Sequence, residues 1–119
     1  MLPQSDPHHF DRTRSDAFKN ADVILIVGTP FDFRMGYGKR ISKEATLVQI
    51  DQSYATVGKN RDISLGLAGS PGAILAAVAQ AASGRIDKGA RQQRQKWMAE
   101  LREIEAAKLE KLMPMFTTD

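Results

Sequence analysis

The sequence predicts an α/β domain built on a partial parallel sheet of about three strands, with flanking helices and a C-terminal helix. Three apolar runs, at 23–27, 46–50 and 63–68, have the length of short buried strands. Polar or glycine-rich stretches separate the runs, and a strongly helical segment follows the last of them. Buried strands separated by crossovers are typical of an α/β sheet.

Length and composition limit what the chain can be. Its 119 residues suffice for one small core, and the absence of cysteine excludes disulfides, thiolate metal sites and cysteine nucleophiles. The start MLPQSDPHHF has no leader-like pattern, and no apolar window is long enough to cross a bilayer. We therefore expect a cytoplasmic protein with no membrane partner.

The first elements follow from local pattern. Residues 1–10 hold two prolines and no apolar period, so they read as loop. Asp11 is placed to cap a short helix to about Asn20, with Ala17 and Phe18 facing inward. The run VILIV at 23–27 is β-branched and unbroken, which favours a strand covered on both faces.

That strand reads as central, yet the chain supplies only two others, so we expect one long sheet edge without a partner. The stretch 28–38 is too broken for a long helix, although a short helical turn after Arg34 fits. Strands are predicted at Thr46–Ile50 and Ile63–Ala68, separated by a polar, turn-like stretch at 52–62.

Two helices complete the pattern. Ser70 is a natural N-cap and Pro71 suits the first position of a helix to residue 82. Its apolar face is Ile74, Leu75, Val78, Ala81 and Ala82. Residues 83–90 read as a linker, and a helix from about Arg91 is expected to stop at Pro114. Its apolar stripe comprises Trp97, Met98, Leu101, Ile104, Leu109 and Leu112, and Glu105 can pair with Arg102 and Lys108.

The candidate ligand-binding residues follow the predicted strands. Ligands of open parallel sheets bind beyond the carboxyl ends of the strands, where Asp51 suits a ribose hydroxyl and Arg34 a phosphate or carboxylate. The alternative is structural: Asp51 caps the following turn, and Arg34 pairs with Asp32. The sequence has neither a GxGxxG motif nor a P-loop.

Other functional classes have little support. His8 and His9 lie in a proline-bounded loop without a regularly spaced third ligand, so we predict no metal site. No GxSxG context or histidine base occurs in the body of the chain, and we predict no catalytic residue. The net charge of +3 is concentrated at 85–96, which we interpret as a solvated helix start with no nucleic-acid partner.

Four motifs in order carry a family resemblance: ADVILIVGTPFDFRMGYG, VQID, VGKN and the strand end LAGS before SPGAILAAVAQ. Over residues 2–82 the chain resembles the central domain of thiamine diphosphate enzymes of the acetolactate synthase group. The resemblance implies a Rossmann-like sheet of six strands, of which this chain looks like the last three. It implies a partial central domain at 1–82, a linker at 83–90, and a helical connector at 91–119 toward a diphosphate-binding domain.

The resemblance also implies cofactors and partners. The full-length enzyme binds thiamine diphosphate and Mg²⁺ through its other domains, so this chain alone is not expected to catalyse decarboxylation and joining of 2-keto acids. Its partners are those missing domains and, at full length, further copies in a homo-oligomer. In flavin-containing members the central domain binds FAD. In a related branch it binds ADP or a CoA nucleotide.

Residue by residue, the cofactor-binding positions that match the family motifs are Gly28, Phe31, Asp32, Arg34, Asp51 and Gly69. Four departures, Pro30, Phe33, Ser53 and Ser70, each replace a polar or charged residue of the family pattern. Losing one charge-assisted hydrogen bond typically costs about 1.5–3 kcal/mol, which argues against flavin.

Two alternatives stay open. Arg14 and Ser15 followed by Ala17 are similar to the oxalyl-CoA decarboxylase and 2-hydroxyacyl-CoA lyase branch. FDFR together with GKN is closer to acetolactate synthase. The other alternative is a free-standing nucleotide-binding module without catalysis.

Overall fold

The computed structural model describes residues 5–10, 12–85 and 87–116. The chain divides into two compact units. The sheet unit is Phe18–Arg85, and the helical unit comprises the described parts of residues 1–17 and 86–119. Each unit is described by itself below.

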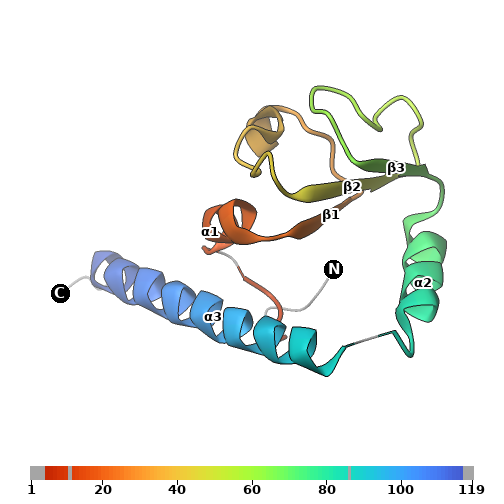
Figure 1. The fold of residues 1–119 in the computed structure, drawn as a ribbon. Helices are drawn as coiled ribbons and strands as arrows, with labels where there is room; N and C mark the ends of the chain where they lie inside the picture. Colours follow the sequence, from red (N-terminus) through yellow and green to blue (C-terminus); the bar gives the residue numbers. More distant parts are fainter. Residues whose placement is uncertain (1–4, 11, 86, 117–119) are drawn as a thin grey trace. The chain divides into compact units, whose positions relative to one another are not determined.

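The sheet unit holds three parallel strands, β1 (Val23–Val27), β2 (Thr46–Asp51) and β3 (Leu65–Ala68). Their order is β1-β2-β3, with β2 in the middle, as Figure 1 shows. The predicted parallel α/β sheet is confirmed. β3 is two residues shorter than predicted at its start, although the Ser64 amide already donates to the Leu47 carbonyl at 2.8 Å.

β1 shows an alternating burial pattern. Ile24 and Ile26 are buried, whereas Val23 and Leu25 are 56% and 42% exposed. The prediction that both faces of this strand are covered is therefore wrong for the described residues, because their core packs on one face only. The predicted open edge is confirmed, since among these residues β1 pairs with β2 alone.

The core of the sheet unit collects side chains from the sheet and from the loop between β1 and β2. Phe31 is its largest fully buried side chain, at 1% exposure. The buried cluster is Ile24, Ile26, Phe31, Met35, Ile41 and Leu47, with Phe18, Ala21, Ala45 and Ile63 packed against it. The loop is thus part of the core, and its position depends on that packing.

A 3-10 segment, η1 (Phe33–Gly38), follows β1 and confirms the expected short helical turn. Gly36 and Tyr37 adopt left-handed φ angles of 58° and 55° inside it. Such angles are uncommon for a tyrosine, so the turn is bent where the two residues meet.

Helix α2 (Pro71–Ala82) begins where the sequence predicts. Ser70 occupies the predicted N-cap position with extended backbone, although its hydroxyl makes no capping hydrogen bond. Pro71 has no N–H to satisfy, and the exposed end of the helix can hydrogen-bond water. On the predicted apolar face, Leu75 and Val78 remain 38% and 41% exposed.

Helix α1 (Arg14–Asn20) begins at Arg14, with the Thr13 carbonyl accepting from the Ala17 amide at 2.9 Å. The predicted cap, Asp11, lies outside the described residues.

Helix α3 (Lys88–Phe116) starts three residues before the predicted Arg91. The Asp87 carboxylate accepts from the Gly89 amide at 3.3 Å, and its carbonyl accepts from the Arg91 amide at 3.0 Å, so Asp87 caps the helix. The predicted stop at Pro114 is also wrong, because a proline in the last turn removes only one backbone hydrogen bond.

The predicted apolar stripe of α3 is buried in its middle. Leu101 is 4% exposed and Ile104 is half-buried, whereas Leu109 is 43% exposed. Within the described residues no helix is both long and apolar enough to cross a membrane.

Candidate functional site

The carboxyl ends of the three strands lie at one edge of the sheet. The Gly28 amide donates to the Ile50 carbonyl at 2.8 Å, and the Gly69 amide donates to the Asp51 carbonyl at 2.9 Å. These bonds continue the strand ladder by one step on each side of β2. Three of the predicted site residues, Gly28, Asp51 and Gly69, are therefore brought together.

The two glycines do not present free amides at this edge. Their amides are already bonded within the sheet, so neither is free to hold a phosphate oxygen. Gly28 has φ +68°, and no heavy atom lies within 4 Å of the place where a Cβ would be. Glycine at this position lets the chain turn away from β1 and leaves open space beside the strand end.

The Asp51 carboxylate bonds locally. Its Oδ1 accepts from the Ser53 amide at 2.8 Å, which is the turn-capping geometry of the structural alternative. The side chain is half-exposed, so the carboxylate is also accessible to a ligand. The two roles are compatible because a carboxylate has several lone-pair sites.

The predicted residues of the loop after β1 have different environments. The Phe31 side chain is in the core, and its carbonyl accepts from Asn60 Nδ2 at 3.1 Å. The Asp32 carbonyl accepts from the amides of Met35 and Tyr37 at 3.0 and 2.9 Å, and its side chain is half-exposed. Arg34 lies in η1, and its side chain is outside what the structure describes.

Arg61 fixes this loop, a role that the sequence reading missed. One guanidinium nitrogen donates to the carbonyls of Gly38 and Ile41 at 2.8 and 3.2 Å, and the other donates to the carbonyl of Ser42 at 3.2 Å. Gly38 ends η1 and the other two acceptors follow it, so Arg61 ties the far end of the loop to the turn before β3. The interacting residues are about 20 positions apart, and no local pattern reveals the pairing.

The turn that carries Arg61 is itself anchored on β2. The Gly58 amide donates to Gln49 Oε1 at 2.8 Å, and Gln49 is fully buried. Gly58 and Asn60 adopt positive φ angles of 81° and 70°, which glycine and asparagine tolerate best. This matches the predicted turn at 52–62. A polar cavity of about 650 Å³ lies beside it, lined by Lys43, Gly58, Asn60, Arg61 and Asp62.

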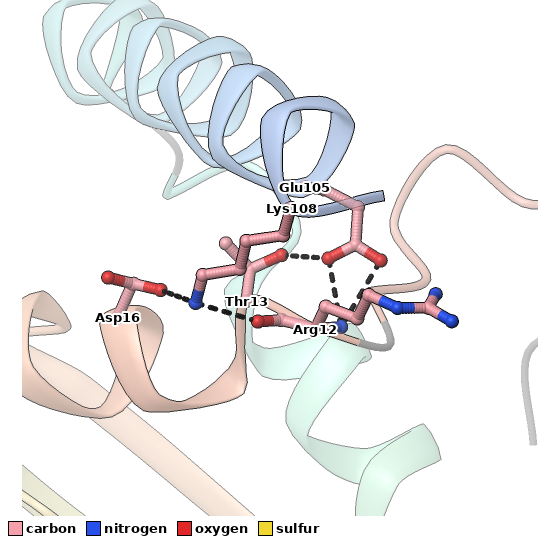
Figure 2. Close-up of polar contacts among 5 residues, drawn as sticks. All are labelled: Arg12, Thr13, Asp16, Glu105 and Lys108. Atoms are coloured by element: carbon pink, nitrogen blue, oxygen red, sulfur yellow. Dashed lines mark hydrogen bonds and ion pairs between the residues drawn. The ribbon is translucent and has the colours of Figure 1, made fainter. Parts of the chain in front are cut away.

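The helical unit is held by charged side chains of α3, shown in Figure 2. The Glu105 carboxylate accepts from the Arg12 amide at 3.1 and 2.9 Å and from the Thr13 hydroxyl. Lys108 Nζ donates to Asp16 Oδ2 at 2.7 Å and to the Arg12 carbonyl at 2.9 Å. Glu105 and Lys108 therefore bind the segment that leads into α1 (Figure 2).

The N-terminal histidines lie in a local turn. The His8 amide and Nδ1 both lie within hydrogen-bond distance of Asp6 Oδ1, at 2.8 and 3.2 Å. The hydrogen bond from the His8 amide lowers the pKa of the Asp6 carboxyl below its ordinary value. Among the described residues no group of three His, Cys, Asp or Glu side chains is arranged to hold a metal ion.

Residues 2–78 match the family described as thiamine pyrophosphate enzyme, central domain. The chain belongs to this family. The match covers both strand-end positions around β2 and the loop that Arg61 fixes, so the site described above is part of the central domain.

Two kinds of relative are similar to this central-domain chain. The acetolactate synthase large subunit IlvG of Mycobacterium tuberculosis is 38% identical over 116 residues, which cover 92% of this chain and 20% of that protein. The 2-hydroxyacyl-CoA lyase 2 of Danio rerio is 28% identical over 88 residues, or 71% and 14% of the two chains. The human 2-hydroxyacyl-CoA lyase 2 is 35% identical over 63 residues, or 53% and 10%. The chain thus spans a fifth or less of the length of these relatives.

The family name implies thiamine pyrophosphate, whose diphosphate is carried by a divalent ion. A diphosphate carried by a divalent ion needs oxygen ligands grouped around the metal. The described residues of this central domain hold no acidic group of that kind. The described residues therefore offer no cluster of acidic side chains to the cofactor's metal.

Proposed function

We propose that this chain forms part of the central domain of an acetolactate synthase-like thiamine diphosphate enzyme, which decarboxylates a 2-keto acid and joins it to a second one. The similarity to the mycobacterial acetolactate synthase carries the proposal, because it extends over 92% of the chain and so beyond the family match at 2–78. In this proposal residues 1–82 belong to the partial central domain, 83–90 link it onward, and 91–119 connect it to a diphosphate-binding domain. The chain does not catalyse alone.

Within that enzyme the loop after β1 and the end of β2 face the substrate channel or a nucleotide. Arg34 and Asp32 supply charge, and Asp51 binds a ribose hydroxyl with the part of its carboxylate that Ser53 does not occupy. Gly28 leaves space at the end of β1, and the buried Phe31 holds the loop in place. At Gly69 a Cβ would lie 3.4 Å from Ile74 Cδ1, so this position depends on the absence of a side chain and on its φ of +152°. The full-length protein is a cytoplasmic homo-oligomer that uses Mg²⁺.

Flavin is not part of the proposal. Pro30, Ser53 and Ser70 stand at positions where the resembling enzymes carry charged groups, and all three are exposed. The amides of Gly28 and Gly69, which could otherwise have donated to a dinucleotide, are bonded within the sheet. We therefore expect that adding FAD leaves the activity of the assembled enzyme unchanged.

A chimera tests the proposal. The matching segment of the mycobacterial acetolactate synthase is replaced by this chain, and acetolactate formation from pyruvate is measured with thiamine diphosphate and Mg²⁺. We expect activity from the chimera and none from the 119-residue chain alone. Arg34→Gln in the chimera should lower kcat/KM by about tenfold or more, because a charge-assisted contact is lost. The matched control is Arg40→Gln, an exposed arginine of the same loop.

The second candidate is the lyase branch, which the similarity to 2-hydroxyacyl-CoA lyase 2 in zebrafish and human supports. A parallel chimera in the human lyase separates the two. If that chimera cleaves a 2-hydroxyacyl-CoA while the synthase chimera folds but does not turn over pyruvate, the acetolactate synthase assignment is wrong.

A further inference from the structure

A basic and aromatic cavity in the helical unit is not explained by the proposed function. It has a volume of about 650 Å³ and is lined by His8, Arg91, Arg94, Gln95, Trp97, Met98 and Arg102. Ligand pockets for small molecules typically measure about 300–1,000 Å³. All lining residues belong to the same unit, and none belongs to the sheet.

The charged side chains that line the cavity are all basic. Three of the seven lining residues are arginines and none is acidic, and the Asp6 carboxylate accepts from the amide of the lining residue His8. Within the described part of the chain, the side chains of Arg91 and Arg94 make no hydrogen bond or ion pair. Guanidinium groups that lack protein acceptors beside an apolar surface favour an anionic ligand.

Helical spacing sets how the arginines share the cavity. Arg91 and Arg94 are three residues apart, so their side chains lie one turn apart on the same face of α3. Arg102 is eleven residues beyond Arg91, or about 16 Å along the axis. Its Nε donates to the Pro7 carbonyl at 3.4 Å, which holds its guanidinium against the 5–10 segment at the other end of the cavity.

Between these ends the lining is a half-buried indole and a half-buried thioether, Trp97 and Met98. An inorganic anion would engage the arginines but leave the indole face unused. An uncharged apolar ligand would cover the indole but leave guanidinium groups without acceptors at its edge. A ligand that joins an aromatic ring to an anionic group satisfies both, since aromatic bases stack on indole rings and arginine binds phosphate.

We propose that this cavity binds a nucleoside phosphate, with the phosphate held by Arg91 and Arg94 and the base stacked on Trp97. The finite size of the cavity favours a mononucleotide over a nucleic-acid strand. The lining residues are not those of the strand-end edge, and the proposal does not depend on which branch of the family the chain represents.

Tryptophan fluorescence of the chain reports on this site directly, because Trp97 is its only tryptophan. We would titrate the 119-residue chain with ADP at fixed salt concentration, following tryptophan emission and binding heat. The expected result is saturable quenching and one binding isotherm, with adenosine and pyrophosphate each binding at least about tenfold more weakly than ADP.

Variants show whether ADP affinity depends on a specific arginine contact or on the general positive charge. Arg94→Gln should weaken ADP binding about tenfold or more, and Arg94→Lys should be intermediate because lysine keeps the charge but loses the planar fork. Lys96→Gln is the matched control. Lys96 lies two residues from Arg94 and does not line the cavity, so this variant removes the same charge without removing a lining side chain. It should change the affinity for ADP less than about twofold. Far-UV circular dichroism establishes that each variant keeps its helix content.

Several results would overturn the proposal. Pyrophosphate binding as tight as ADP would show a plain anion site, and adenosine binding as tight as ADP would show an apolar one. Equal losses for Arg94→Gln and Lys96→Gln would show diffuse electrostatic attraction. A short oligonucleotide that binds far more tightly than ADP would show a nucleic-acid surface, and the absence of saturable ADP binding at millimolar concentration would show no site.

Discussion

Arg61 donates to the Gly38 carbonyl at 2.8 Å, across 23 residues of sequence. With its bonds to Ile41 and Ser42, this contact makes one side chain responsible for the end of the loop that carries Asp32 and Arg34. The carbonyls sit in a partly buried region, so removing the guanidinium deprives them of donors and costs free energy.

Arg61→Ala should therefore lower the free energy of unfolding of the sheet unit by about 2–4 kcal/mol, since three hydrogen bonds to a charged group are lost. Arg61→Lys should recover only part of this, because an ammonium group cannot span three carbonyls in a fixed fork. Urea unfolding measures both. Lys59→Ala, an exposed cation of the same turn, is the control and should stay within about 0.5 kcal/mol of the parent.

Glu105 should matter most in the helical unit. Its carboxylate accepts from the Arg12 amide and the Thr13 hydroxyl, and Thr13 is fully buried. Glu105→Ala should cost about 1.5–3 kcal/mol and should speed hydrogen exchange of the Arg12 amide. Glu103→Ala on the exposed face is the control. If the two variants gave equal exchange at Arg12, the bond would not exist in solution.

Lys108 should contribute much less to stability. Its side chain is 41% exposed and that of Asp16 is 33% exposed, so water screens the ion pair between them. Lys108→Met should change the free energy of unfolding by less than about 1 kcal/mol, and the difference should shrink as sodium chloride is raised. A large, salt-independent loss would contradict this view of the pair.

Gly66 of β3 has no room for a side chain. A Cβ there would lie 2.3 Å from Val57 Cγ1 and 3.0 Å from Ile63 Cδ1. Gly66→Ala should destabilise by about 1–3 kcal/mol, and combining it with Val57→Ala should remove most of that penalty in a double-mutant cycle. Gly72→Ala is the matched control, because no atom lies within 4 Å of its Cβ position and alanine favours a helix. Additive losses in the cycle would rule out the clash.

Lowering the pH should weaken the turn at Asp6. The folded state lowers the pKa of Asp6 below 3.8, chiefly through the His8 amide. The stabilisation is therefore complete above the unfolded pKa and is lost as pH falls through the lower folded pKa. Carbon-13 NMR of the carboxyl should give a midpoint below 3.8 in both the parent and His8→Ala, since alanine keeps the amide. A midpoint that returned to 3.8 in His8→Ala would assign the shift to the imidazole.

The sequence predicted those features that depend on neighbouring residues. The run at 23–27 has the apolar, β-branched composition of a strand, and it forms β1 at the predicted bounds. Pro71 likewise marked the first residue of α2. Asp87 escaped notice as a cap because its segment looked like linker, yet its carboxylate begins α3.

The candidate site was predictable only in part. Asp51 and the glycines were found because they follow strands, and parallel strands end at one edge. Arg61 and Glu105 act on backbone groups roughly 20 and 90 residues away, and such pairings depend on the fold rather than on local pattern. The basic run before Trp97 is exposed, as predicted for a solvated helix start, but no local pattern reveals that the folded helix brings Arg94 and the indole to one cavity.

The unpaired side of β1 has a practical consequence for handling the protein. Among the described residues β1 meets a partner on one side only, and its five residues VILIV include no charge or proline that would discourage another strand from adding there. Val23 and Leu25 also leave an apolar stripe in water. A preparation of the 119-residue chain should therefore aggregate as its concentration rises, and a lysine at position 25 would act as a gatekeeper that keeps it dispersed.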